Sequence, residues 1–273
     1  EMSRGLGDVY KRQLHKTFNP GTVNEKVALN GVSLQMEAGD FATIVGSNGA
    51  GKSTLFNAIT GGFIADEGSI LLGGQDITFA PEHQRSKVIG HLFQDPLKGT
   101  APNMTIEENL ALAYLRAGTA PNAIFSRISR KDKALFREKL ALLDMGLEDR
   151  MKQPVGLLSG GQRQALTLLM ATLVTPKLLL LDEHTAALDP RTAQKVLALS
   201  DQLIEENGLT AMMVTHNMRD AIAHGNRLIM MHEGRVILNI AGEEKKKLTV
   251  EDLLHQFEKV SGEEFANDKA LLS

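Results

Sequence analysis

The stretch from Gly46 to Ser53, GSNGAGKS, constrains the fold of this chain more than any other. It fits the pattern G-x-x-x-x-G-K-[ST] at every constrained position. An apolar, β-branched run over 41–45 precedes it, and a helical pattern over 53–59 follows it. This order of strand, glycine loop and helix is the context that makes the pattern credible rather than a chance glycine turn before a helix. The sequence therefore predicts a phosphate-binding loop, called the P-loop below.

The residue types of the P-loop have chemical reasons. Its glycines allow backbone angles that a Cβ would forbid, so that successive N–H groups can point inward at phosphate. The positive end of the following helix dipole adds to that field. Lys52 is expected to reach the β- and γ-phosphates, and the Ser53 hydroxyl to bind Mg²⁺. We therefore expect the chain to bind a nucleoside triphosphate. The expected contact residues are Gly46, Ser47, Asn48, Gly49, Ala50, Gly51, Lys52, Ser53 and Thr54.

The composition limits the remaining possibilities. With 273 residues the chain can bury a full core, as one large domain or as a domain with an insertion. Its net charge of −3 gives no bulk electrostatic reason to expect nucleic acid as a partner. The absence of cysteine excludes disulfides and thiolate metal sites, and it fits a reducing compartment. No apolar run approaches the roughly 18–20 residues of a membrane helix, and no signal peptide is evident.

Residues 1–13 are expected to be foreign to the protein. The hexapeptide over 8–13, DVYKRQ, is encoded by the end sequence of a transposon adapter used in sequencing libraries. We therefore expect the native sequence to start near Leu14, with part of a native first strand missing. The alternative is an ordinary polar N-terminus that happens to match.

Short strands are predicted on both sides of the P-loop. Residues 32–36 alternate like a half-buried strand, and the runs 68–72 and 88–93 also have strand character. Gly61 and Gly62 are expected to end the helix that follows the P-loop.

The pattern becomes helical after residue 94. Thr105 and Glu108 have the spacing of a capping box at the start of one helix, and 131–145 predicts a second helix. We interpret 95–156 as a helical subdomain. Its basic residues are expected to form a solvated face rather than a binding patch. They are Arg116, Arg127, Arg130, Lys131, Lys133 and Arg137.

The alternation of strand and helix resumes at 178–181, an apolar run that suits a parallel strand covered on both faces. Asp182 at its end can hold Mg²⁺, and Glu183 stands where an attacking water could be polarised. A helix over 190–206 and a strand over 210–215 are expected next. The domain organisation is then an ATP-binding α/β core over 14–94 and 157–241, the insertion over 95–156, and a C-terminal helical tail over 242–273.

His216 follows the last predicted strand, at the carboxyl edge where α/β sheets place ligands. Taken alone, a histidine there would more often be a packed or capping residue. Its place beside the expected nucleotide site favours a functional role.

A second candidate anion site lies ahead of another helical pattern. Serine and two glycines at a helix N-terminus can bind an anion for the same reasons as the P-loop. This signature segment consists of Leu158, Ser159, Gly160, Gly161 and Gln162. One triphosphate does not need two such cradles on one chain unless they serve different copies.

With these motifs in this order, the chain resembles the ATP-binding-cassette (ABC) family from Leu14 to about Ile240. The resemblance implies an α/β P-loop NTPase core with a mixed sheet and an inserted helical subdomain, and ATP with Mg²⁺ as cofactors. It implies a homodimer in which each ATP lies between the P-loop of one chain and the signature segment of the other. Phe18 matches the aromatic residue that stacks on adenine in this family, and Asp189 matches a residue of the dimer contact.

The resemblance also implies catalytic roles for residues beyond the P-loop. Gln94 would contact the metal and the attacking water, together with Asp182 as a metal ligand, and His216 would bond the γ-phosphate. The reaction is phosphoryl transfer to water, in which positioning and charge stabilisation dominate, and Glu183 is the best general base. One departure is His184, because proline commonly follows the glutamate in this family. We expect no loss of chemistry from that change.

Two functional classes remain open. The first is the ATPase subunit that energises a membrane transporter, and the second is a soluble cassette ATPase acting on ribosomes or DNA ends. Ribosome-associated members carry two cassettes in one chain, and DNA-repair members split the cassette with a very long coiled coil. This chain has one P-loop and one signature segment, and Gln94 is not far from Ser159 in sequence. Both features favour the transporter subunit.

Partners and cargo follow from the same resemblance. The expected partners are a second copy, an integral-membrane permease and a solute-binding protein, with the chain on the cytoplasmic face of the membrane and no nucleic acid. A permease helix would dock against exposed apolar residues such as Leu97, Met104 or Leu112. The chain looks like a bacterial group of amino-acid-type importers, for which tryptophan or tyrosine is suggested. Lipid or lipoprotein export is the competing interpretation.

Overall fold

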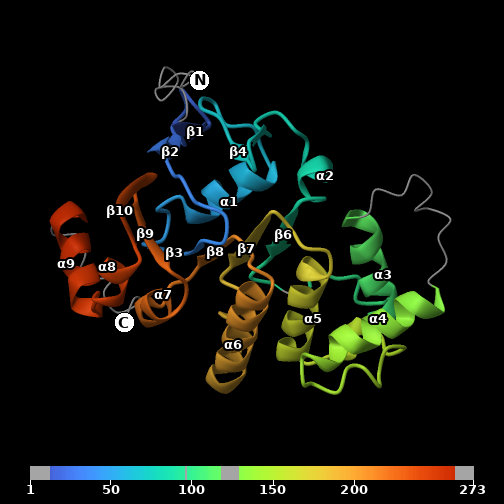
Figure 1. Cartoon of the computed structure of the whole chain (residues 1–273). Coiled ribbons are helices and arrows are strands. Elements are labelled where there is room, and N and C mark those ends of the chain that lie inside the picture. The colour runs from blue at the N-terminus through green and yellow to red at the C-terminus, as the bar shows by residue number, and fades with distance from the viewer. Residues whose placement is uncertain (1–12, 96, 118–128, 262–273) are drawn as a thin grey trace, which may run out of the picture. The chain divides into compact units, whose positions relative to one another are not determined.

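The computed structural model describes residues 13–95, 97–117 and 129–261. The chain divides into two compact units, which are treated separately: unit 1 spans 1–85 and 212–273, and unit 2 spans 86–211 (Figure 1). Most of the segment expected to be foreign, residue Arg127 and the end of the C-terminal tail lie outside the described residues.

Unit 1 is built on the strand that leads into the P-loop. β3 (Phe41–Gly46) is buried at every residue and runs parallel to β9 (Arg227–His232). β10 (Arg235–Ala241) pairs with β9 in the antiparallel sense, and β8 (Ala211–Val214), at the boundary of the unit, neighbours β3 on its other side. The order β10-β9-β3-β8 is therefore a mixed sheet, which confirms the predicted fold class.

Two small antiparallel ladders accompany this sheet. One is formed by β1 (Leu14–Phe18) and β2 (Lys26–Val32), and the other by β4 (Leu71–Leu72) and β5 (Gln75–Asp76). The predicted strand over 68–72 is shortened to β4, because its partner β5 has only two residues.

The strand predicted over 32–36 is wrong. β2 ends at Val32, and residues 33–36 lie outside the strands that the structure describes. Ser33 and Gln35 are exposed while Leu34 and Met36 are half-buried, so the alternation of side chains is real. Alternation shows which side chains are covered, but a strand also needs a neighbour for its backbone hydrogen bonds.

The helix after the P-loop, α1 (Lys52–Thr60), is bounded by glycines at both ends. Gly51 precedes it with φ 99° and Gly61 follows it with φ 87°, and the Gly61 N–H donates to the Asn57 carbonyl. Gly61 therefore ends the helix as predicted, in the left-handed conformation that glycine adopts at helix C-termini.

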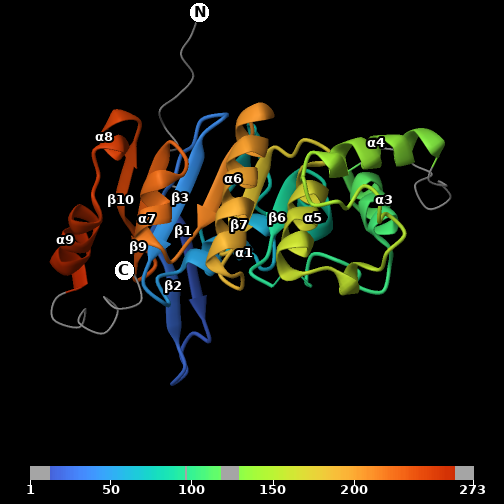
Figure 2. The same cartoon turned by 90° about the horizontal axis from the view of Figure 1, so that it is seen from below.

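The C-terminal part of unit 1 packs on the same sheet. α7 (Met218–Ala223) is capped by Asn217, whose side chain accepts from the N–H groups of Arg219 and Asp220 in the first turn. α8 (Glu243–Lys246) and α9 (Val250–Ser261) follow β10 (Figure 2). α9 buries Leu253 and Phe257 in a cluster with residues of β3, α7 and β9.

Unit 2 contains the predicted helical subdomain and a parallel strand pair. β6 (Ile89–Leu92) runs parallel to β7 (Leu178–Asp182), and α5 (Gly160–Thr172) packs beside α6 (Pro190–Glu206) (Figures 1 and 2). The bounds of α6 agree with the predicted range.

The helical part of unit 2 contains α3 (Ile106–Ala117), α4 (Arg130–Ala141) and the short 3-10 turn η3 (Val155–Leu157). Thr105 and Glu108 form the predicted capping box of α3. α4 ends at Ala141 rather than at 145. The chain turns there, with Asp144 at φ 50°, a conformation that cannot continue a right-handed helix.

Within the part of the chain that the structure describes, no helix has both the length and the apolar character needed to cross a bilayer.

A buried arginine anchors the C-terminal end of α1. Arg85, the last residue of α2 (Glu82–Arg85), is 2% exposed. Its guanidinium donates to the carbonyls of Ala58 (2.7 Å), Ile59 (2.9 Å), Thr78 (2.8 Å) and Ala80 (2.7 Å). Burial lowers the pKa of Arg85, and the first two carbonyls belong to the last turn of α1, where a positive charge complements the helix dipole. The C-terminal end of the P-loop helix is thus held by the 78–85 segment.

We expect Arg85→Met to lower the free energy of unfolding by about 3 kcal/mol or more, because each buried carbonyl left without a donor costs roughly 1–3 kcal/mol. Urea unfolding followed by circular dichroism measures the loss. Arg219→Met is the matched control, because Arg219 is exposed on α7 of the same unit. Equal losses in both variants would contradict the anchoring role.

Candidate functional site

The P-loop passes so close to neighbouring backbone that glycine is required at two positions. A Cβ on Gly46 would collide with the Met231 carbonyl oxygen of β9, and a Cβ on Gly51 would lie 2.5 Å from the Ala28 carbonyl oxygen of β2. Gly51 also has φ 99°, which disfavours other residues. The loop is therefore held between β2 and β9 by steric fit.

The turn between β9 and β10 adds a hydrogen-bonded clamp. The Gly234 N–H donates to the Ala50 carbonyl at 3.0 Å, and the Gly234 carbonyl accepts from the Asn30 N–H at 2.8 Å. One turn residue thus ties the P-loop to β2. The sequence analysis did not single out Gly234, and a glycine in a short turn gives no signal of this contact.

Lys52 lies inside the loop as its position in the motif predicts. It is 5% exposed, and its ammonium donates to the Gly46 carbonyl at 2.6 Å and to the Ser47 carbonyl at 3.0 Å. A buried cation beside the N-terminus of α1 suits an anionic ligand, because both favour negative charge. Ser53 lies exposed in the first turn of α1, so its hydroxyl can reach a ligand.

His216 belongs to the same unit as the P-loop. The Thr215 N–H, next to it in the chain, donates to the Ile44 carbonyl of β3 at 3.1 Å. This bond places the His216 segment beside the strand that leads into Gly46. The strand β8 ends at Val214, so His216 lies just beyond the strand instead of at its last residue.

Phe18 is the last residue of β1 and belongs to the same unit. Its ring meets Phe63 edge to face, with centroids 5.5 Å apart, and the Lys16 ammonium lies 5.6 Å from the Phe18 centroid. Phe18 is 37% exposed. Part of this ring is therefore accessible to a ligand, and the rest contacts Phe63 and lies near the Lys16 ammonium.

Lys26 is a cation near the P-loop that the sequence analysis missed. It pairs with Phe18 in the β1–β2 register, and its ammonium lies 3.4 Å from where a Cβ on Gly49 would be. The β1–β2 register brings Lys26 there, so its position in the sequence could not predict that it lies near the P-loop.

Unit 2 holds the acidic residues and the glutamine. Leu92 of β6 pairs with Leu181 of β7 in a parallel register. Asp182 follows Leu181 directly, and Gln94 and Glu183 each stand two residues after their paired leucine. All three therefore lie at the same edge of the strand pair, where parallel sheets collect functional side chains. Glu183 has φ 46°, an unusual value for a residue other than glycine.

The signature segment forms the N-terminus of α5. The Ser159 hydroxyl accepts from the Gln162 N–H at 3.3 Å, and the Gln162 side chain accepts from the Ser159 N–H at 3.2 Å, a capping box. The Ser159 hydroxyl keeps its own proton for a ligand. A Cβ on Gly161 would collide with the Thr192 methyl group of α6, so this end of α5 is packed tightly on α6.

Asp189 is the N-cap of α6. Its carboxylate accepts from the Thr192 N–H at 3.1 Å, and hydrogen bonding by the Thr192 side chain, followed by that of the N–H, lowers the pKa of Asp189. Asp189 therefore caps α6 in this structure, and the dimer contact expected for it stays a prediction.

The predicted site residues thus fall into two sets. Phe18, the P-loop and His216 belong to unit 1, whereas the others belong to unit 2. The second set contains Gln94, Leu158, Ser159, Gly160, Gly161, Gln162, Asp182, Glu183 and Asp189.

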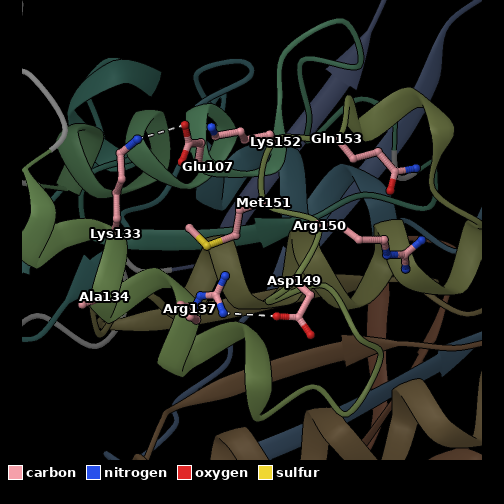
Figure 3. Close-up of a pocket in the computed structure, with 9 residues that line it drawn as sticks. All are labelled: Glu107, Lys133, Ala134, Arg137, Asp149, Arg150, Met151, Lys152 and Gln153. Atoms are coloured by element: carbon pink, nitrogen blue, oxygen red, sulfur yellow. Dashed lines mark hydrogen bonds and ion pairs between the residues drawn. The ribbon is translucent and has the colours of Figure 1, made fainter.

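A separate pocket of about 470 Å³ lies in the helical part of unit 2 (Figure 3). Ion pairs span it, Lys133–Glu107 and Arg137–Asp149, each at 3.1 Å, with the Met151 side chain between them. Lys133 and Arg137 thus pair with acidic side chains and remain exposed, at 44% and 60% of their side chains, as the predicted solvated face requires. Among the described residues, the pocket is lined by none of the predicted site residues.

Comparison with known proteins gives related sequences across nearly the whole chain. Residues 29–186 match the family described as ABC transporter. The tyrosine transport ATP-binding protein of Clostridioides difficile (strain R20291) is 42% identical over 247 residues, which cover 90% of this chain and 97% of that protein. The methionine import ATP-binding protein MetN of Corynebacterium efficiens is 36% identical, over 83% of this chain and 60% of that protein. The lipoprotein-releasing system ATP-binding protein LolD of Ruegeria sp. (strain TM1040) is 35% identical, over 82% and 95%.

Solved structures agree with these relatives. The dimeric ATP-binding cassette MJ0796 in a post-hydrolysis state with ADP and Pi has a TM-score of 0.72 at 27% identity, covering 84% of this chain and 97% of that one. The ADP conformation of the cassette MJ1267 has a TM-score of 0.71 at 28% identity, covering 90% and 96%. Sequence and fold lead to one family: the chain belongs to the ABC transporters, as the ATP-binding ATPase subunit of a transport system.

Proposed function

We propose that the P-loop residues, Gly46 to Thr54, hold the phosphates of ATP together with Mg²⁺. The observation that carries this proposal is the buried Lys52 at the N-terminus of α1, in a loop whose glycines Gly46 and Gly51 pass close to neighbouring backbone. Ser53, Gln94 and Asp182 supply oxygen donors, which are the ligands that Mg²⁺ prefers. Phe18 provides an accessible ring surface for adenine.

Hydrolysis is assigned to residues at the ends of the strands. Glu183 acts as the general base on the attacking water, Gln94 orients that water, and His216 bonds the γ-phosphate. These roles use positioning and charge, which dominate phosphoryl transfer. The bound metal contributes positive charge that offsets the charge on the phosphate oxygens.

The signature segment is proposed to complete the site of a second copy. The Ser159 hydroxyl accepts from the Gln162 N–H and can still donate its own proton to a ligand, so the N-terminus of α5 is a second anion-binding end, which ATP on the same chain does not need. The dimeric state of the similar cassette MJ0796 supports a homodimer, with Asp189 at the contact.

Coupling to transport requires a membrane partner. We propose that the chain attaches to an integral-membrane permease on the cytoplasmic face, in a system that also has a solute-binding protein. Leu97 is 45% exposed and Leu112 is 50% exposed in unit 2, so both are available as anchors, while Met104 is half-buried.

The proposed cargo is a small solute of the amino-acid type, imported into the cell. The support is the relative named for tyrosine transport, which matches over 97% of its own length. The LolD relative, matched over 95% of its length, favours lipoprotein or lipid export as the second candidate. Uptake of labelled tyrosine by proteoliposomes that contain the chain with its own permease decides between them. Uptake that depends on ATP supports import, and release of lipoprotein without uptake supports export.

Lys52→Ala is expected to weaken ATP binding by at least about tenfold, because it removes a charge-assisted contact to the phosphates. AMP, which lacks the β- and γ-phosphates, should lose much less affinity. Titration with fluorescent ATP and AMP analogues measures both. Lys246→Ala is the control, an exposed lysine that pairs with Glu243 three residues before it. Equal losses for both nucleotides would show that Lys52 supports the loop rather than the phosphates.

Glu183→Gln is expected to lower the ATPase rate by at least about 10²-fold, the lower end for loss of a general base. ATP binding should persist, and the mutant should accumulate as a closed dimer because hydrolysis no longer opens it. Light scattering with and without ATP and Mg²⁺ detects the dimer, and Glu205→Gln, on the exposed face of α6, is the control. A mutant that hydrolyses at the wild-type rate would rule out this base.

Leu97→Asp is expected to leave ATP binding and dimer formation near normal but to reduce recovery of the permease. Interfaces of this kind depend on a few buried anchors, and a carboxylate would be costly to bury there. Co-purification with the permease measures the effect beside the ATPase rate of the chain alone. Leu142→Asp is the matched control, since Leu142 is 49% exposed just after α4. Equal recovery with both variants means that Leu97 is not an anchor.

A further inference from the structure

The residue after the proposed general base is buried and bonded to a helix. His184 is 2% exposed, and its Nε2 lies 3.0 Å from the Ser200 hydroxyl in the middle of α6. Ser200 itself is 1% exposed. A buried imidazole joins the segment that carries Glu183 to α6, at the position where histidine replaces the proline common in the family.

The direction of the hydrogen bond between His184 and Ser200 follows because a serine hydroxyl has one proton to donate. The Ser200 hydroxyl donates its only proton to the Val196 carbonyl, at 2.9 Å. The oxygen can therefore only accept from the ring, so Nε2 of His184 carries the proton and donates. The bond is fully buried, where an unmade hydrogen bond is costly, so it is a firm restraint.

Glu183 needs such a restraint because its backbone is strained. Its φ of 46° lies in the left-handed region, which non-glycine residues adopt only where the surroundings enforce it. The Glu183 carbonyl accepts from the Ala186 N–H at 3.0 Å, which closes a turn on one side. Proline at 184, as in the family pattern, would restrict the backbone through its ring, and histidine lacks that restriction. The ring of His184 restrains the loop by its contact with α6 instead.

We propose that His184 is a positioning residue for catalysis: through Ser200 it holds Glu183 in the strained conformation that aims its carboxylate at the attacking water. The proposal rests on the proposed role of Glu183 as the base. His184 would position the base without contacting the P-loop, so its loss should lower the rate of hydrolysis and leave the affinity for ATP nearly unchanged.

The test measures kcat, KM and the dissociation constant of ATP for His184→Ala and Ser200→Ala. A base displaced by about 1 Å can cost on the order of 10²-fold in rate, so we expect a fall in kcat of about 10- to 100-fold with KM and ATP affinity within about twofold. His184→Gln keeps a side-chain N–H donor and should recover most of the rate. Thr172→Val is the matched control, because Thr172 makes the same kind of bond, to the Leu168 carbonyl, within α5.

Combination with Glu183→Gln distinguishes positioning from general support of the fold. If His184 acts through Glu183, then His184→Ala adds no further loss of rate once the base is gone, and the two alanine variants together are no worse than either alone. A further loss in the Glu183→Gln background would overturn the proposal, and so would a wild-type kcat for Ser200→Ala. If His184→Ala does not fold, Ser200→Ala and His184→Gln carry the test. Full activity of Glu183→Gln itself would instead refute the proposed function.

Discussion

The close passage of the P-loop between neighbouring backbones is the constraint on which the rest of unit 1 depends. Gly46 and Gly51 leave no room for a side chain against the carbonyls of Met231 and Ala28. A loop that binds phosphate through its own amides must be rigid before the ligand arrives, because ordering it on binding would reduce affinity. The buried strand β3, its neighbour β9 and the Gly234 turn all serve to hold the loop in this shape.

Buried polar groups supply the other restraints, and they follow one rule. A polar group removed from water must find a hydrogen-bond partner, so each buried polar side chain fixes the distance between the segments it joins. Arg85 joins two carbonyls at the C-terminal end of α1 to two carbonyls of the 78–80 segment, and His184 joins the loop after β7 to Ser200 of α6. Apolar packing alone would tolerate small shifts at these points, whereas hydrogen bonds are sensitive to distance and angle.

The N-termini of two helices fit the proposal that each ATP site is shared between two copies of the chain. α1 begins at the P-loop and α5 begins at the signature segment, each in its own unit. The capping box at Ser159 satisfies its backbone neighbours and still leaves a hydroxyl proton for a ligand. A subunit with two such ends and the proposed general base fits an ATPase whose site is shared between copies, as proposed above.

Local patterns in the sequence determined the P-loop, the buried strand before it, the bounds of α6 and the capping box of α3, because each depends on residues a few positions apart. The strand predicted over 32–36 failed because pairing depends on a distant neighbour. Only the tertiary structure brought Lys26 to Gly49, Arg85 to the end of α1 and His184 to Ser200. The residues in these contacts are separated along the chain by distances that match neither the helical nor the strand periodicity, so no sequence pattern predicts them. The sequence by itself therefore contains the residue types of the proposed site, while the contacts that position them appear only once the chain has folded.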